Sequence, residues 1–286
     1  MITYSIDIFN KEYDFTLNDK VKTTIGYLNK QFQDSANRNH RRGGKREYDP
    51  NFTVTKFEKK SEIQQHIGEI KMLLNKLTDR TFDKISEELF ILLDKIEDND
   101  DKFEEVSKVI FKIVSSNSGF SCIYARLYKQ LVDKYEIFMN KIDICLEMNN
   151  KLIYNFVQVS SEENYDEFCK MNEDKQIRRA LVSFLSNACL LKLIDLSVII
   201  KYVDDLLNSV YQEMNKEDNR MVVEEVAEVI YIFITICNKM LKDTEEYNGF
   251  LNNIKILSKL TVNDYQSCSS RAKFKYLDIL DFVKKH

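Results

Sequence analysis

Residues 73–85 read LLNKLTDRTFDKI, a stretch that ends one apolar-striped helix and begins the next. Before it, Ile63, Ile67 and Ile70 recur at three- and four-residue spacing, which places them on one helix face. After it, the same period runs over residues 82–96, and Thr78 stands where an N-cap belongs. Two amphipathic helices with so short a connection predict an αα-hairpin.

The rest of the chain repeats this design. A hairpin of this kind buries its apolar stripe only when another hairpin stacks on it. We expect Ser118 to cap a helix over 120–135, and residues 160–163 to form a cap and first turn. Further apolar periods cover 102–116, 137–159, 173–193, 196–214, 220–241, 245–260 and 266–285. The pattern predicts an all-α HEAT-type α-solenoid of about five antiparallel helix pairs over residues 61–286.

Composition supports a helical, soluble protein. One proline and six glycines in 286 residues are too few for the turns of a β or α/β fold. The formal net charge of −4 is uneven, because residues 1–46 carry nine Lys and Arg against five Asp and Glu. An acidic body behind a small basic arm argues against bulk nucleic-acid binding.

Cysteine and histidine usage excludes several classes of site. The six cysteines form no CxxC pair, and three histidines are too few for a zinc pattern. Most cysteines fall on apolar helix faces, so we expect buried, reduced thiols in an intracellular protein. We expect no metal and no cofactor.

No catalytic constellation is visible either. His40, His66 and His286 accompany no nucleophile motif, and no glycine-rich phosphate loop follows a strand. The pairs Glu87–Glu88, Glu104–Glu105 and Glu224–Glu225 lack the Glu-x-x-His of di-metal bundles, and we place them on exposed faces. A non-enzymatic interaction scaffold is therefore the expected class.

The arm has two parts. Residues 34–46 are polar and glycine-bearing and predict a flexible linker. The Lys and Arg side chains of this linker could make a weak, salt-sensitive contact with RNA phosphates. More often, a run of charged residues like this one is simply solvated. These cations are Arg38, Arg41, Arg42, Lys45 and Arg46.

Residues 47–60 follow the linker. Asp49 and Pro50 form an N-cap with proline at the first helical position. Aromatic side chains flank this turn, a pattern typical of a segment that folds on binding. The alternative is that Tyr48 and Phe52 pack on the start of the domain.

Several stretches resemble one family. LLNKLTDRTFDKIS is similar to the opening of the middle domain of eukaryotic translation initiation factor 4 gamma, and EVSKVIFKIVSSNSGFSCIYARLYKQLV resembles its second repeat. IRRALVSFLSNACLLKLIDL looks like the third repeat, although Val182, Ser183 and Cys189 depart from it. SSRAKFKYLDILDFVKKH resembles the closing helix. The resemblance covers residues 61–286.

The resemblance implies two partners. Residues 47–60 are similar to the segment that grips the cap-binding subunit, initiation factor 4E, through Tyr48, Pro50, Phe52, Val54 and Phe57. Thr53 departs from the leucine of that motif. The domain implies binding of the DEAD-box helicase, initiation factor 4A, through Leu74, Leu77, Thr78 and Phe82 at its start and Arg271, Phe274 and Asp278 at its end. For the apolar residues among these, membership of the core is the alternative.

The expected function is a cytoplasmic translation-initiation scaffold that bridges both partners on mRNA. One alternative is another HEAT-repeat adaptor of mRNA metabolism, of the nuclear cap-binding, decay or poly(A)-binding-protein-interacting type. A structural HEAT protein of an unrelated pathway is a second. The sequence is rich in Lys, Asn and Ile. This usage fits an AT-rich genome, such as that of a giant DNA virus or a protist.

Overall fold

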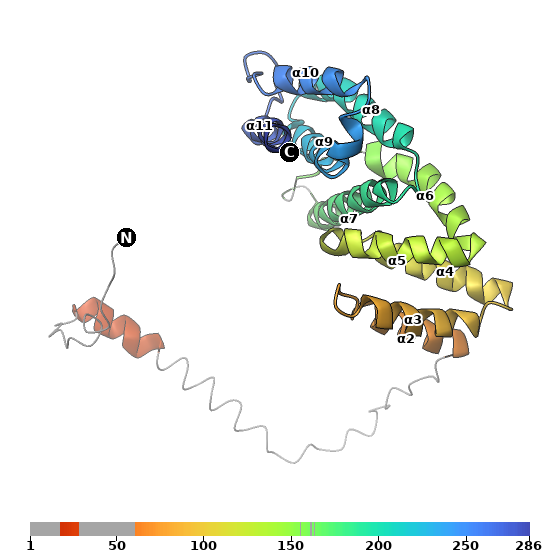
Figure 1. Ribbon diagram of the computed structural model, residues 1–286. Coiled ribbons are helices and arrows are strands. Elements are labelled where there is room, and N and C mark those ends of the chain that lie inside the picture. The colour runs from red at the N-terminus through yellow and green to blue at the C-terminus, as the bar shows by residue number, and fades with distance from the viewer. Residues whose placement is uncertain (1–17, 29–60, 155, 161, 163) are drawn as a thin grey trace, which may run out of the picture. The chain divides into compact units, whose positions relative to one another are not determined.

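A computed structural model of the chain describes residues 18–28 and 61–286, apart from residues 155, 161 and 163 (Figure 1). The chain divides into two compact units, residues 1–58 and 59–286. The first unit contains a described helix over residues 19–28. Within the described residues both units are free of β-strands, and every helix is too short or too polar to cross a membrane.

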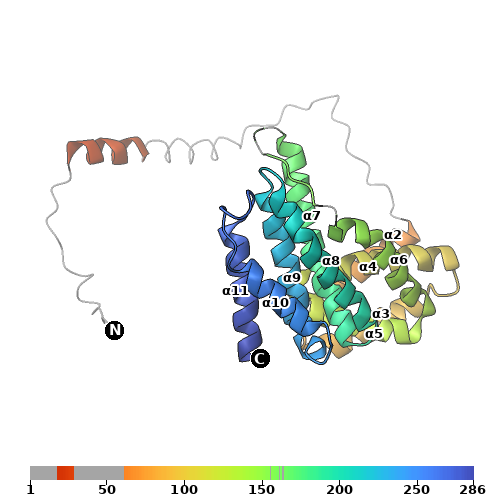
Figure 2. The same cartoon turned by 90° about the horizontal axis from the view of Figure 1, so that it is seen from above.

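The second unit is the predicted α-solenoid. Its described residues form ten α-helices, and Figure 1 and Figure 2 show them as stacked antiparallel pairs. Helices α5, α7, α9 and α11 follow one another along one side, and α4 and α6 pack on each other along the other side. The helices are α2 (Glu62–Leu74), α3 (Phe82–Asp94), α4 (Asp100–Val114), α5 (Ser121–Lys134), α6 (Glu136–Tyr154), α7 (Tyr165–Leu190), α8 (Leu196–Asn215), α9 (Arg220–Leu241), α10 (Tyr247–Leu257) and α11 (Ser270–Lys285).

The junction between α2 and α3 differs from the expectation in its cap. Thr78 is not the N-cap of α3, because the helix begins at Phe82 and Thr81 precedes it. The two threonines close a separate turn: Thr78 N–H donates to Thr81 Oγ1 at 2.9 Å, and Thr81 N–H donates back to Thr78 Oγ1 at 3.3 Å. The hydroxyl of Thr81 also donates to the carbonyl of Lys76 at 2.7 Å. Both threonines therefore fix the hairpin angle, and Thr81, which stands at the N-cap position of α3, makes no side-chain cap hydrogen bond to that helix.

The N-termini of two other helices also differ from the predicted ones. Ser118 begins a 3₁₀ turn, η3 (Ser118–Phe120), and α5 starts after it at Ser121. Helix α7 begins at Tyr165, before the predicted 173, because the Asn164 side chain accepts the Glu167 N–H at 3.1 Å. Ser160 instead accepts the N–H of Glu162, outside the helix. The first turns of α7 are mostly exposed and carry no clear apolar period. The apolar periodicity therefore does not predict where this helix begins.

An aromatic cluster joins α4, α5, α6 and α7. Tyr128 meets Phe111, Phe138 and Phe184 edge-to-face, with ring centroids 5.5–5.6 Å apart. The Tyr128 hydroxyl donates to the Phe138 carbonyl at 2.8 Å, which satisfies its buried polar atom. Four consecutive helices are thereby fixed against one another.

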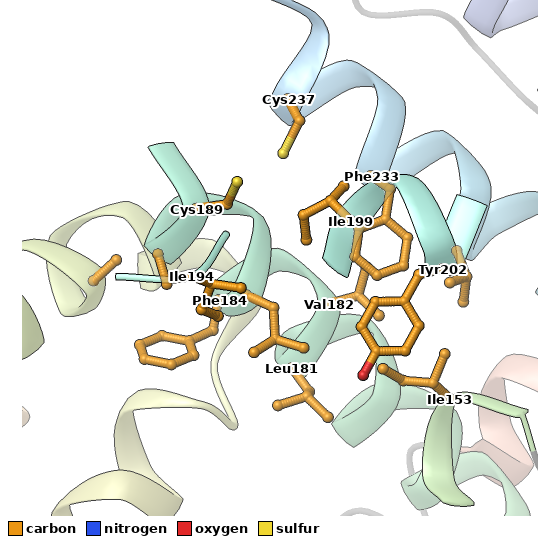
Figure 3. Packing of buried hydrophobic residues seen from close by; sticks show 14 of the residues in the cluster. Ile153, Leu181, Val182, Phe184, Cys189, Ile194, Ile199, Tyr202, Phe233 and Cys237 are labelled. Atoms are coloured by element: carbon orange, nitrogen blue, oxygen red, sulfur yellow. The ribbon is translucent and has the colours of Figure 1, made fainter. Parts of the chain in front are cut away.

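Helix α7 is the central helix of the domain. Every residue from Ala180 to Cys189 is buried, so this half of α7 has no exposed face to give an amphipathic pattern. Figure 3 shows Val182 of α7 beside Ile199 and Tyr202 of α8 and Phe233 of α9. There the rings of Tyr202 and Phe233 stack, with centroids 5.6 Å apart and planes 9° apart. The Phe184 ring points to the opposite side, where it meets Phe111 and Tyr128.

A half-buried ion pair makes the contact between α4 and α6 sensitive to acid. Glu104 accepts a hydrogen bond from the buried Lys141 and lies 3.0 Å from Lys108. Hydrogen bonds from Lys141 and then Lys108 lower the pKa of the Glu104 carboxyl from its ordinary 4.5. A carboxyl whose pKa is lower in the folded state stabilises the fold above its unfolded pKa, and this contribution is lost as pH falls through the folded pKa.

We therefore expect the thermal midpoint to fall as pH drops below about 4.5, and Glu104→Gln to remove part of that dependence. Thermal melts across this pH range measure the effect. The neighbouring exposed variant Glu105→Gln serves as the control. Identical pH profiles for wild type and Glu104→Gln would contradict the role of this pair.

Candidate functional site

The last helix, α11, presents the predicted closing residues on one exposed face. Ser269 caps the helix by accepting the Arg271 N–H at 3.2 Å. Ala272, Tyr276 and Ile279 are buried, and α11 packs on α9 and α10. The remaining face exposes Phe274 at 63%, together with Arg271 and Asp278. The structure thus brings these three predicted residues to one surface.

Ion pairs hold α11 in register with α9. Arg271 Nη1 lies 3.7 Å from Glu224 Oε2, and Lys275 Nζ lies 3.2 Å from Glu228 Oε2. Lys275 also lies over the ring of Tyr231, 4.3 Å from its centroid. Because acidic residues of α9 and basic residues of α11 repeat at four-residue spacing, the two helices match along one line. This ladder fixes the direction in which the exposed face of α11 points.

Behind this ladder lies a charged cleft of about 490 Å³ between α7, α9 and α11. One of its lining residues is a carboxylate held by two arginines: Glu225 lies 3.4 Å from Arg178 Nη1 and accepts from Arg179 Nε at 3.1 Å. Glu225 and Arg178 are both buried, which corrects the expectation that the pair Glu224–Glu225 faces solvent. Burial lowers the pKa of the Arg178 guanidinium, and the charge of Glu225 opposes that change. The cleft is lined by Asn172, Lys175, Gln176, Arg179, Met221, Glu224, Glu225, Glu228, Arg271 and Lys275.

The predicted residues at the start of the domain are mostly core. Leu74, Leu77 and Phe82 are 1%, 3% and 4% exposed, so their side chains are not available to a partner. The physical reason is that the α2–α3 hairpin turns these three side chains inward against the following helices. Only Thr78 of this group is exposed.

The surface around Thr78 contains a residue that the sequence analysis missed. The Arg126 guanidinium of α5 lies over the Phe82 ring, 4.3 Å from its centroid. Its Nη1 donates to Asp79 Oδ1 at 3.1 Å, which links α5 to the α2–α3 turn. The side chains of Arg126 and Asp79 are both substantially exposed. They are 47 residues apart in sequence, so no local pattern signals their contact.

The two clusters lie at opposite ends of the helical stack, because α2 and α3 begin it and α11 ends it (Figure 1). The predicted cap-binding segment and the predicted RNA contact fall outside the described residues, so both stay predictions. The residues concerned are Tyr48, Pro50, Phe52, Thr53, Val54 and Phe57, and Arg38, Arg41, Arg42, Lys45 and Arg46. Among the described residues no group of three or more His, Cys, Asp or Glu side chains is arranged to hold a metal ion.

Comparison with known families decides the affiliation. The family model of the MIF4G domain matches residues 67–286, which is most of the chain and nearly all of its second unit. The chain belongs to the MIF4G domain family. The resemblance of this region to the middle domain of initiation factor 4 gamma is thereby confirmed. No curated protein matches the chain.

MIF4G domains are helical scaffolds or adaptors, and members of the family bind helicases and cap-binding proteins. The observed α-solenoid agrees with that class. The family also includes adaptors other than initiation factor 4 gamma, so the match establishes the class of protein.

Proposed function

We propose that this MIF4G protein is a translation-initiation scaffold that bridges a cap-binding subunit and a DEAD-box helicase on mRNA. The observation that carries the proposal is the exposed face of α11, where the family match ends. Phe274 leaves 63% of its surface in water, so a partner that covered it would bury apolar area there. Aromatic and arginine side chains together are typical of the energetic centre of protein interfaces.

The helicase contact proposed here has two parts. Arg271, Phe274 and Asp278 form one, and Thr78 with Arg126 and Asp79 forms the other at the far end of the stack. A partner with two mobile lobes can place one lobe on each cluster. Holding both lobes favours one of their relative arrangements, so the scaffold shifts a conformational equilibrium and performs no chemistry itself.

The cap-binding contact is proposed for residues 47–60. Tyr48, Phe52, Val54 and Phe57 supply the apolar side chains, and Pro50 sets the first turn. Thr53 replaces the leucine of the motif, which removes about 1–2 kcal/mol of apolar burial. We therefore expect Thr53→Leu to bind a cap-binding subunit more tightly than the wild type, by about tenfold.

Pulldowns with separately supplied cap-binding and helicase subunits test the two-site arrangement. Phe274→Ala is expected to lose the helicase and keep the cap-binding subunit, while Tyr48→Ala does the reverse. Ile256→Ala, an exposed apolar residue of α10, is the matched control for Phe274. Tyr13→Ala is the control for Tyr48 within the same arm. Loss of both partners in either variant would contradict separate sites.

A second function is an adaptor of another mRNA pathway, of the nuclear cap-binding, decay or poly(A)-binding-protein-interacting type. The departure at Thr53 favours it, because that change weakens the motif for the cap-binding subunit. Helicase binding by the wild type without any binding of a cap-binding subunit would select this second function.

A further inference from the structure

Two buried cysteines face each other across the interface between α7 and α9. Cys189 and Cys237 are both 0% exposed, and Figure 3 shows their sulfur atoms directed toward one another. The Cys237 thiol donates to the carbonyl of Ser186, 3.6 Å away and one turn before Cys189. Cys122 and Cys169, by contrast, are exposed.

We propose that Cys189 and Cys237 are a reversible disulfide site that crosslinks α7 to α9 when a small-molecule disulfide oxidises it. A disulfide needs two sulfur atoms on facing side chains of neighbouring backbones, and the packing of α7 on α9 supplies this. A disulfide between Cys189 and Cys237 would close a loop of the chain that contains α8.

The end of α7 provides the path for the oxidant. Cys189 is the penultimate residue of the helix, and the next residue, Leu190, is 40% exposed. Lys192 has a φ of 58°, and the Leu193 N–H bonds back to the Ala188 carbonyl at 3.0 Å, so the chain reverses here. A terminal turn opens at a lower free energy than the middle of a core helix. Such an opening exposes Cys189 while α9 stays folded.

The chemistry assigns an order to the two thiols. The neighbouring Cys237 thiol lowers the pKa of Cys189, whereas the contact with Cys189 and burial raise the pKa of Cys237. Cys189 is therefore the thiolate that attacks first.

With oxidised glutathione, the Cys189 thiolate attacks one sulfur and releases one glutathione thiol, which leaves a mixed disulfide. Cys237 then loses its proton to solvent, attacks the Cys189 sulfur and releases the second glutathione. Two protein thiols become one disulfide, and one oxidised glutathione becomes two reduced molecules.

Incubating the full-length protein with oxidised glutathione, followed by non-reducing digestion and mass spectrometry, tests the proposal. The expected product is one peptide that joins Cys189 to Cys237, lighter by two hydrogen atoms and separated again by dithiothreitol. The thermal midpoint of the oxidised protein should rise by roughly 4–12 °C, because the bond constrains the unfolded chain. The Cys122→Ser/Cys169→Ser double variant should give the same product, and Cys189→Ser should not.

The proposal is overturned if Cys122 and Cys169 acquire glutathione while Cys189 and Cys237 stay separate thiols. It is also overturned if the joined peptide forms only under conditions that unfold the protein. Both of these outcomes are measured on the wild-type protein. The test therefore stays decisive even if Cys189→Ser folds poorly.

Discussion

Replacing Glu225 with glutamine is expected to lower the free energy of unfolding by about 3–5 kcal/mol. The carboxylate lies between Arg178 and Arg179 at the α7–α9 contact, and only 2% of it is exposed. Arg178 is itself 3% exposed, so the variant leaves a buried guanidinium without its carboxylate. Breaking one side of a buried ion pair costs far more than removing a surface pair, because the remaining charge is already desolvated.

Chemical denaturation measures this loss directly, and the thermal midpoint should fall by about 6–20 °C. Glu105→Gln, an exposed substitution of the same kind in α4, should change the free energy of unfolding by no more than about 0.5 kcal/mol. If Glu225→Gln were as stable as the wild type, Glu225 and its two arginines would not be buried away from solvent as they are in the structure.

Phe184→Ala is the second substitution with a large expected effect, about 3–5 kcal/mol. The ring is fully buried and meets both Tyr128 and Phe111 edge-to-face. Removing it opens a cavity where α4, α5 and α7 meet, and the rigid helices around it can close that cavity only in part. The cost therefore combines lost burial with an unfilled volume.

The measurement is again denaturant unfolding, with Phe274→Ala as the matched control. That residue has the same side chain but is 63% exposed, so its truncation should cost little stability. A comparable loss for both variants would contradict the burial pattern that separates core from partner surface.

The sequence was sufficient for the fold because its apolar residues repeat at helical spacing over nearly the whole chain. Where a stripe was complete, as over 196–214 and 220–241, the predicted and observed helices agree closely. Where local hydrogen bonds decide, the pattern failed. The reciprocal bonds of Thr78 and Thr81 and the cap by Asn164 depend on side-chain geometry that periodicity does not encode.

The candidate site was predictable only in part, for a similar reason. A helical period identifies a face but not whether that face meets the core, so Leu74, Leu77 and Phe82 were assigned to a partner although they are buried. Phe274 is exposed and shares its face with the charged residues Arg271 and Asp278, and its contact with a partner stays a prediction. The clusters of Arg126 with Asp79 and of Glu225 with two arginines join residues 46–47 positions apart. Such contacts arise from stacking of the repeats.

We propose that this MIF4G protein acts on a DEAD-box helicase through the outer face of α11. The most direct test is the RNA-dependent ATPase rate of the cognate helicase with and without the protein. We expect a higher rate with the wild type and with Ile256→Ala, and loss of that increase with Phe274→Ala, which should fold normally. A wild-type protein that neither binds the helicase nor raises its ATPase rate would contradict the proposed helicase contact.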